Sequence, residues 1–307
     1  MAVTAAMVKE LRESTGVGMV DCKNALTETD GNIEKAIDLL REKGLAAAAK
    51  KAGRIASEGL VFANILPDNS VGAVIEVNSE TDFVAKNVEF KTYVENVSKQ
   101  VLASKSNTLE ELLNETWAED TSLTVQEALN QKIAVIGENL SIRRFERFEK
   151  QDNGALVAYV HGAGKVVVLL DLVSDVVNDT LKEAGRNICM QIAAMSPKFV
   201  NRDEVPAEFI EKEKEILTQQ AINEGKPANI VEKMIAGRLN KELKAKCLCD
   251  QEYVKDDNMS VSQYLESVSK EIGATISIAR FVRFETGEGL EKKEENFADE
   301  VNKAIQG

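Results

Sequence analysis

IGENLSIRRFERFE at residues 136–149 returns as IGATISIARFVRFE at residues 272–285. In each stretch an Ile-Gly pair precedes a run in which apolar and polar side chains alternate, which is typical of a β-strand that follows a helix end. Two such stretches in one chain indicate an internal duplication. We therefore expect two related subdomains, each closed by one of these strands.

The segments upstream of the two strands support the duplication. Residues 60–66 and 71–77 alternate around a turn at 67–70, and a helix is expected near 88–102. The same order returns at residues 155–160 and 165–172, which flank a turn at 161–164 and precede a helix near 178–195. Directly joined hairpins favour antiparallel pairing, so the sequence predicts an α+β fold with a duplicated antiparallel core rather than a doubly wound sheet.

The segment before the first hairpin is helical in pattern. Apolar residues recur at helical spacing in three short runs within residues 1–44, which predicts a three-helix bundle. Gly44 is expected to cap the third helix. An exposed, alanine-rich connecting helix marked by Lys50, Lys51 and Arg54 is expected to follow.

An insertion interrupts the second repeat at about residues 201–247. Two apolar helical faces flank a reversal at 224–227, which predicts a projecting antiparallel helical hairpin, with two ordinary core helices as the alternative. We therefore divide the chain into four parts. These are residues 1–54 as the bundle with its connecting helix, 55–150 and 151–286 as the two core subdomains, and 287–307 as a C-terminal module.

Composition narrows the class of protein. The chain has 307 residues and a formal net charge of −13, which repels phosphate backbones and argues against a nucleic-acid partner. No stretch approaches the roughly 20 apolar residues that span a bilayer, and the N-terminus lacks the apolar core of a signal peptide. Four scattered cysteines fit a reducing compartment. We expect a cytoplasmic protein without membrane contact.

Catalytic and metal-binding patterns are sparse. His161 is the single histidine, so a catalytic triad or a two-histidine metal site is not expected, and its place at a hairpin tip predicts a surface contact instead. Cys247 and Cys249 lack the second half of a zinc motif. The doublet Asp256-Asp257 is typical of a solvated face. The sequence predicts no enzyme activity and no metal or cofactor.

One short segment admits two interpretations. Thr81, Asp82, Phe83 and Val84 follow the second predicted strand. The first interpretation is a helix start, in which Thr81 or Asp82 caps the helix and Phe83 is tucked beneath it. The second is a binding element, in which an exposed phenyl ring beside a carboxylate fills a pocket of a partner.

Several motifs in order resemble the elongation factor Ts family. They are Thr81-Asp82-Phe83-Val84-Ala85-Lys86, the opening VKELRE at 8–13 with TGVGM at 15–19 and DCK at 21–23, IGEN at 136–139, His161-Gly162-Ala163, and Arg283-Phe284-Glu285 onward to Gly289. The resemblance spans nearly the whole chain. It implies that the N-terminal bundle is similar to ubiquitin-associated domains and that the C-terminal module is helical.

The same resemblance implies a function. Members of this family bind elongation factor Tu carrying GDP, as a heterodimer, and accelerate release of the nucleotide without covalent chemistry. By analogy, Asp82 and Phe83 would enter the GTPase domain near its magnesium site. Arg12, Met19 and Val20 would contact the same domain, and His161 would contact another. The chief alternative is a structural or scaffolding protein in which residues 81–84 only cap a helix, and a weaker one is a hydrolase that uses His161 or an acidic pair.

Overall fold

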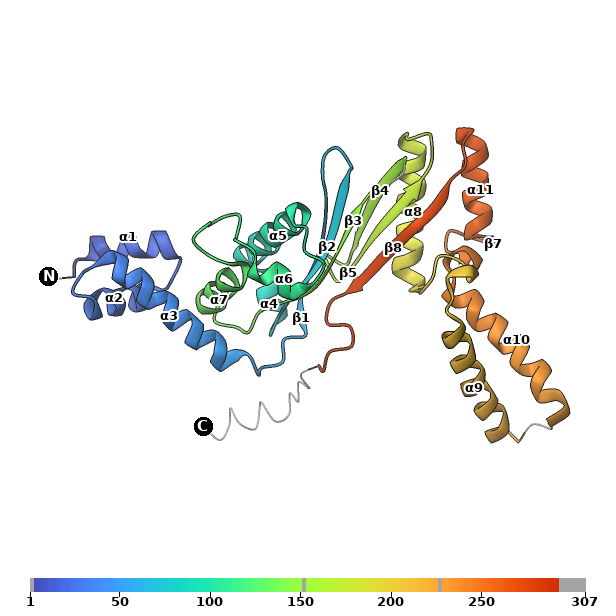
Figure 1. The fold of residues 1–307 in the computed structure, drawn as a ribbon, viewed down its shortest axis with the longest axis horizontal. Coiled ribbons are helices and arrows are strands. Elements are labelled where there is room, and N and C mark those ends of the chain that lie inside the picture. The colour runs from blue at the N-terminus through green and yellow to red at the C-terminus, as the bar shows by residue number, and fades with distance from the viewer. Residues whose placement is uncertain (1–2, 151–152, 226–227, 293–307) are drawn as a thin grey trace. The chain divides into compact units, whose positions relative to one another are not determined.

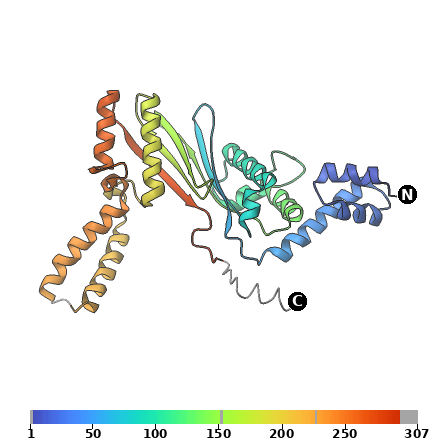
Figure 2. The ribbon, with the colours of Figure 1, turned by 180° about the vertical axis from the view of Figure 1, so that it is seen from behind.

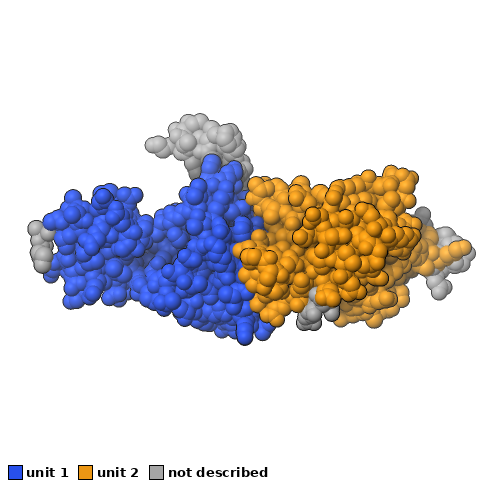
Figure 3. All heavy atoms as spheres, turned by 90° about the horizontal axis from the view of Figure 1, so that it is seen from above, with its two compact units in different colours: residues 1–62, 75–145, 285–307 blue, residues 63–74, 146–284 orange. Residues whose placement is uncertain are grey.

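The protein mixes helices with small antiparallel sheets, as the predicted α+β class requires. A computed structural model describes residues 3–150, 153–225 and 228–292. The chain forms two compact units, one of residues 1–62, 75–145 and 285–307 and the other of residues 63–74 and 146–284 (Figure 3).

Three helices open the first unit: α1 (Ala5–Thr15), α2 (Met19–Glu28) and α3 (Ile33–Lys51). The side chains of Thr4 and Asn32 cap α1 and α3 by accepting backbone N–H groups of the first turn. Gly16 ends α1 in the left-handed conformation, with φ +70°. Leu11, Cys22 and other apolar side chains on facing sides of the helices form a small core.

Gly44 and the connecting helix differ from expectation. Gly44 lies inside α3 rather than at its end, and α3 continues without a break to Lys51. A Cβ atom placed on Gly44 would lie 3.7 Å from the Cβ of Ala134 on α7 (Val125–Ile136). Gly44 thus lies where α3 packs on α7, at a distance that an added methyl group would meet as an ordinary contact.

The first repeat forms a three-stranded sheet in the order β1-β2-β3 (Figure 1). Its strands are β1 (Glu58–Ile65), β2 (Val71–Ser79) and β3 (Ser141–Glu149). The N–H of Leu66 donates to the carbonyl of Val71, and the amide of Asn78 donates to the carbonyl of Glu58, so β1 and β2 run antiparallel. Between β2 and β3 lie α4 (Asp82–Lys86), α5 (Val88–Ala103), α6 (Leu109–Asn114) and α7.

The second repeat forms a sheet in the order β4-β5-β8. β4 (Gly154–His161) pairs antiparallel with β5 (Val166–Val173), and β8 (Ser277–Glu285) lies on the other side of β5. Two helices, α8 (Asp179–Met195) and α11 (Val261–Ile272), lie beside this sheet in both ribbon views (Figures 1 and 2). Side chains of the sheet and both helices share one core, in which Leu170, Ile188 and Leu265 take part.

Two long helices occupy the insertion of the second repeat. α9 (Ala207–Asn223) and α10 (Ala228–Lys246) lie side by side and extend away from the sheet in both ribbon views. Elements that the sequence did not predict surround them. They are the short 3-10 helices η1 (Arg202–Glu204) and η2 (Leu248–Asp250) and the ladder of β6 (Glu252–Tyr253) with β7 (Asp256–Ser260).

Some expectations stay predictions. The C-terminal helical module at 287–307 falls largely outside the described residues, which end at 292. The likeness of the bundle to ubiquitin-associated domains and the four-part division also stay predictions. Among the described residues, no helix is long and apolar enough to span a membrane.

Candidate functional site

The turn between β2 and α4 presents an exposed phenyl ring. Thr81 is the N-cap of α4, and its hydroxyl accepts the N–H of Val84 at 3.4 Å. Ala85 is the residue that this one-turn helix buries, whereas the Phe83 side chain is 80% exposed. The predicted helix start is thus confirmed, and the predicted burial of Phe83 that accompanied it is wrong.

Charged groups accompany the ring. Asp82 pairs with Lys86 one turn later, at 2.6 Å between Oδ2 and Nζ, and its side chain is about half exposed. The Lys86 ammonium also lies 6.0 Å from the centroid of the Phe83 ring. Large apolar side chains are usually buried, so a solvent-exposed phenyl ring on a short turn is a candidate binding element. The expectation that Asp82 and Phe83 lie exposed where the second strand meets its helix is confirmed.

A second carboxylate, that of Glu138, holds this turn through hydrogen bonds. Glu138, just after α7, accepts the backbone N–H groups of Glu80 at 3.1 Å and of Thr81 at 3.0 Å with its Oε2. Its Oε1 accepts the Thr81 hydroxyl at 2.6 Å. In return, Glu80 Oε1 accepts the backbone N–H of Asn139 at 2.6 Å. The two turns that flank the sheet are therefore tied to each other by reciprocal carboxylate hydrogen bonds.

The middle strand carries a buried carboxylate below the same turn. Glu76 is fully buried and accepts hydrogen bonds from Arg143 at 3.0 Å, from Arg144 at 2.6 Å and from the backbone N–H of Gly287 at 2.7 Å. The carboxamide of Asn78 also donates to it, at 3.1 Å. Two guanidinium groups compensate the cost of burying this charge, so β2, β3 and the start of the segment after β8 are held at one point.

The predicted contact residues of the bundle lie on its surface. Met19 and Val20 open α2 and are 54% and 71% exposed, whereas Cys22, which comes soon after them in the same helix, is buried. Arg12 on α1 is exposed as well. These three residues and the turn at 81–84 all belong to the first unit.

His161 belongs to the second unit, at the end of β4. It is exposed, and its Nδ1 lies 3.3 Å from the hydroxyl of Tyr159, two residues earlier on the same face of the strand. Val160 between them is half exposed. The tyrosine hydroxyl restricts the orientation of the imidazole, so the hairpin tip presents a defined polar contact.

The other reactive side chains offer little chemistry. Burial raises the pKa of the Cys249 thiol to about 11 and that of the buried Cys189 well above its usual range, so both thiols stay protonated at neutral pH. Hydrogen bonds from Asn258 lower the pKa of Asp256, which is the opposite of what a general acid needs. The described part of the chain holds no group of three or more histidine, cysteine or acidic side chains suited to a metal ion.

Sequence reasoning missed Glu138 and Glu80 as supports of the turn. The sequence places Glu138 only within the IGEN motif at residues 136–139, and its pattern assigns no role to Glu80. A signal was present, because the repeats place Glu138 opposite Ala274 while most of the flanking apolar and arginine positions match.

Sequence comparison identifies relatives that cover nearly the whole chain. The family model described as Elongation factor TS matches residues 80–288. Elongation factor Ts of Clostridioides difficile (strain 630) is 53% identical over 304 residues, covering 99% of both chains. Elongation factor Ts of Clostridium perfringens (strain SM101 / Type A) is 54% identical over 301 residues, covering 98% of both chains.

Proposed function

The chain belongs to the elongation factor Ts family of translation elongation factors, and on that premise we propose that it is a guanine nucleotide exchange factor for elongation factor Tu. It binds elongation factor Tu carrying GDP and promotes release of the nucleotide. The observation that carries this proposal is the Phe83 ring, 80% exposed on a turn that two carboxylates brace. The factor makes and breaks no covalent bond and acts in the cytoplasm.

The mechanism follows from how a GTPase holds its nucleotide. Backbone amides cradle the phosphates, and a magnesium ion requires near-octahedral oxygen ligands. A phenyl ring that inserts among the side chains of the partner near this site displaces those groups, and the Asp82 carboxylate alters the charge around the ion. A loss of either support weakens GDP binding. Because the coupling is reciprocal, bound GDP weakens binding of the factor by the same ratio.

The remaining exposed residues supply affinity in this proposal. Met19 and Val20 form an apolar patch at the start of α2, with Arg12 as a cationic neighbour in the same bundle, and these residues contact the GTPase domain. His161, oriented by Tyr159, contacts another domain of the partner. Apolar and cationic anchors of this kind dominate protein interfaces.

The scaffolding alternative finds less support. It requires residues 81–84 to serve only as a helix cap, with Phe83 buried beneath the helix. The cap is present, but the ring is directed to solvent. No feature of the described residues specifically favours a scaffold or a hydrolase.

A single assay tests the proposal. Elongation factor Tu is loaded with a fluorescent GDP and mixed in a stopped-flow instrument with excess unlabelled GDP and increasing amounts of the factor. We expect the release rate to rise with factor concentration and to approach a maximum. Added GDP should also dissociate the purified complex of the two proteins. A release rate that does not change at any factor concentration would overturn the proposal.

A further inference from the structure

We propose that Glu138 is a positioning residue that holds the turn carrying Phe83 in its binding conformation before the partner arrives. The inference rests on the proposed function, in which that turn enters the partner. Glu138 does not reach the partner in this inference. It acts through the backbone of Glu80 and Thr81 and through the Thr81 hydroxyl.

The hydrogen bonds between Glu138 and residues 80–81 form a clamp, and their geometry supports this role. One oxygen of the Glu138 carboxylate accepts two successive backbone N–H groups, at 3.1 and 3.0 Å, and the other accepts the Thr81 hydroxyl at 2.6 Å. Bonds of this kind to a charged acceptor are about twice as strong as neutral ones. Thr81 also caps α4, so a single residue connects the carboxylate to the one-turn helix that bears Phe83.

A hydrogen bond in the reverse direction, from the turn after α7 to Glu80, completes the clamp. Glu80 accepts the N–H of Asn139 at 2.6 Å, and the Asn139 side chain donates to the carbonyl of Arg54 at 2.8 Å. A helix of five residues has too few internal hydrogen bonds to fix its own orientation. The direction of the Phe83 ring therefore depends on these external bonds.

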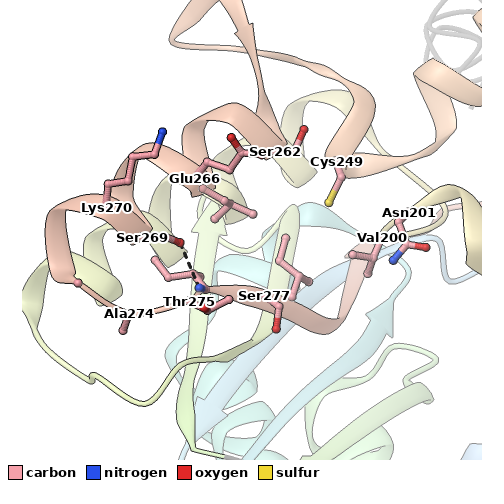
Figure 4. Close-up of a pocket in the computed structure, with 14 residues that line it drawn as sticks. Val200, Asn201, Cys249, Ser262, Glu266, Ser269, Lys270, Ala274, Thr275 and Ser277 are labelled. Carbon is pink, nitrogen blue, oxygen red and sulfur yellow. Dashed lines mark hydrogen bonds between the residues drawn. The ribbon is translucent and has the colours of Figure 1, made fainter.

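The second repeat provides an internal control. There, Ala274 takes the place of Glu138, and the chain passes from β5 to α8 without an additional helix. Ala274, Thr275 and Ser277 line an open groove of about 680 Å³ (Figure 4). In the turn after α11, the N–H of Ile276 donates to the hydroxyl of Ser269 on α11 at 3.1 Å. This contact joins the turn only to the helix that precedes it. The first repeat thus has both the Glu138 carboxylate and the turn with the exposed ring, and the second repeat has neither.

A braced turn matters because binding a loose one costs conformational entropy. A loop that is already ordered loses less freedom on association, and a wedge held in position acts on the site more effectively. The bundle and His161 supply affinity in the proposed function. Loosening the clamp should therefore lower the maximal rate of GDP release more than it weakens binding.

The experiment compares Glu138→Gln with Glu127→Gln in the full chain. Glutamine keeps the size of the side chain but puts an N–H₂ group where one oxygen accepts hydrogen bonds. Glu127 is the matched control because it lies at the other end of α7 and also accepts a backbone N–H and a threonine hydroxyl, both from Thr124, at 2.7 and 3.1 Å. Should Glu138→Gln fail to fold, Glu80→Ala opens the clamp from the other side.

Two readouts decide the matter. Hydrogen exchange of the free protein should show faster exchange of the Glu80 and Thr81 amides in Glu138→Gln and no change there in Glu127→Gln. In the GDP-release assay, the maximal rate should fall about tenfold while the half-saturating factor concentration stays within about twofold.

The outcomes separate this inference from the proposed function. If the unaltered chain releases GDP normally and Glu138→Gln matches Glu127→Gln in maximal rate, the positioning role is overturned, whatever the exchange of the two amides. Equal loss of affinity and maximal rate would also overturn it. Failure of the unaltered chain to accelerate release would instead overturn the proposed function.

Discussion

The two repeats share a buried ion pair in the sheet and differ in the connection that follows the middle strand. In the first, the buried Glu76 on the middle strand pairs with Arg144 on the third strand at 2.6 Å. In the second, the buried Asp171 on the middle strand pairs with Arg280 on the third strand at 3.2 Å. Arg144 and Arg280 hold the same place in the duplicated motif. The duplication has therefore kept the buried ion pair of the sheet.

The connection after the middle strand is where the copies diverge. In the first repeat, residues 80–86 separate the end of β2 from Asn87, which caps α5, and they form α4 with its exposed ring. In the second, Asn178 caps α8 soon after β5 ends. A shared sheet with a different turn fits the proposed function, in which the turn of the first repeat enters the partner.

Loss of a buried carboxylate should have the largest effect, on the free energy of unfolding. The size of this effect should differ between the two repeats. Glu76→Gln leaves two guanidinium groups without their buried partner, so we expect it to lower the free energy of unfolding by about 3 kcal/mol. Asp171→Asn weakens the pair with Arg280, whose side chain is already 40% exposed, and we expect a loss of about 1 kcal/mol. Urea denaturation measures both values. An equal loss in the two variants would contradict the greater role of Glu76.

Removal of the exposed ring comes next and concerns function alone. Phe83→Ala should lower the maximal rate of GDP release about thirtyfold, equivalent to roughly 2 kcal/mol, because hot-spot side chains contribute on that scale. The half-saturating concentration should change less, and urea denaturation should be unaffected. The control is Val177→Ala, an apolar residue 51% exposed in the corresponding connection of the second repeat. A maximal rate in Phe83→Ala equal to that of the control would sink the wedge mechanism.

The helical elements attached to the two repeats should differ in their contribution to binding, with a smaller effect. The first repeat carries the bundle, through α3 on α7, and the second carries the α9–α10 hairpin. Val20→Asp should raise the half-saturating concentration about tenfold, since it puts a charge into an apolar contact, while the maximal rate stays within about twofold. Ile222→Asp at the exposed end of α9 is the matched control. If the hairpin variant weakens binding as much, the anchor is not confined to the bundle.

Much of this contrast was predictable from sequence, and the failures have local causes. The repeated strands, both hairpins and the cap at Thr81 follow from period and turn chemistry, which act within a few residues. The exposure of Phe83 did not follow from the type of residue, which favours burial, and was expected only through the family resemblance; the packing of Ala85 shows which side of α4 faces inward. Gly44 was misplaced because α3 continues through it to Lys51 and packs on α7, which is distant in sequence. The Glu138 clamp was missed for the same reason.

The smallest expected effect tests whether the carboxylate alone creates the site. Ala274→Glu puts the missing carboxylate into the second repeat, where the open groove can accommodate its side chain. We expect GDP release to stay within about twofold of the unaltered chain and the free energy of unfolding to change by less than about 0.5 kcal/mol. The connection after β5 has neither a threonine cap to hold nor a phenyl ring to present. A marked gain in exchange would mean that the longer turn of the first repeat is dispensable, and that the clamp rather than the ring distinguishes the two copies.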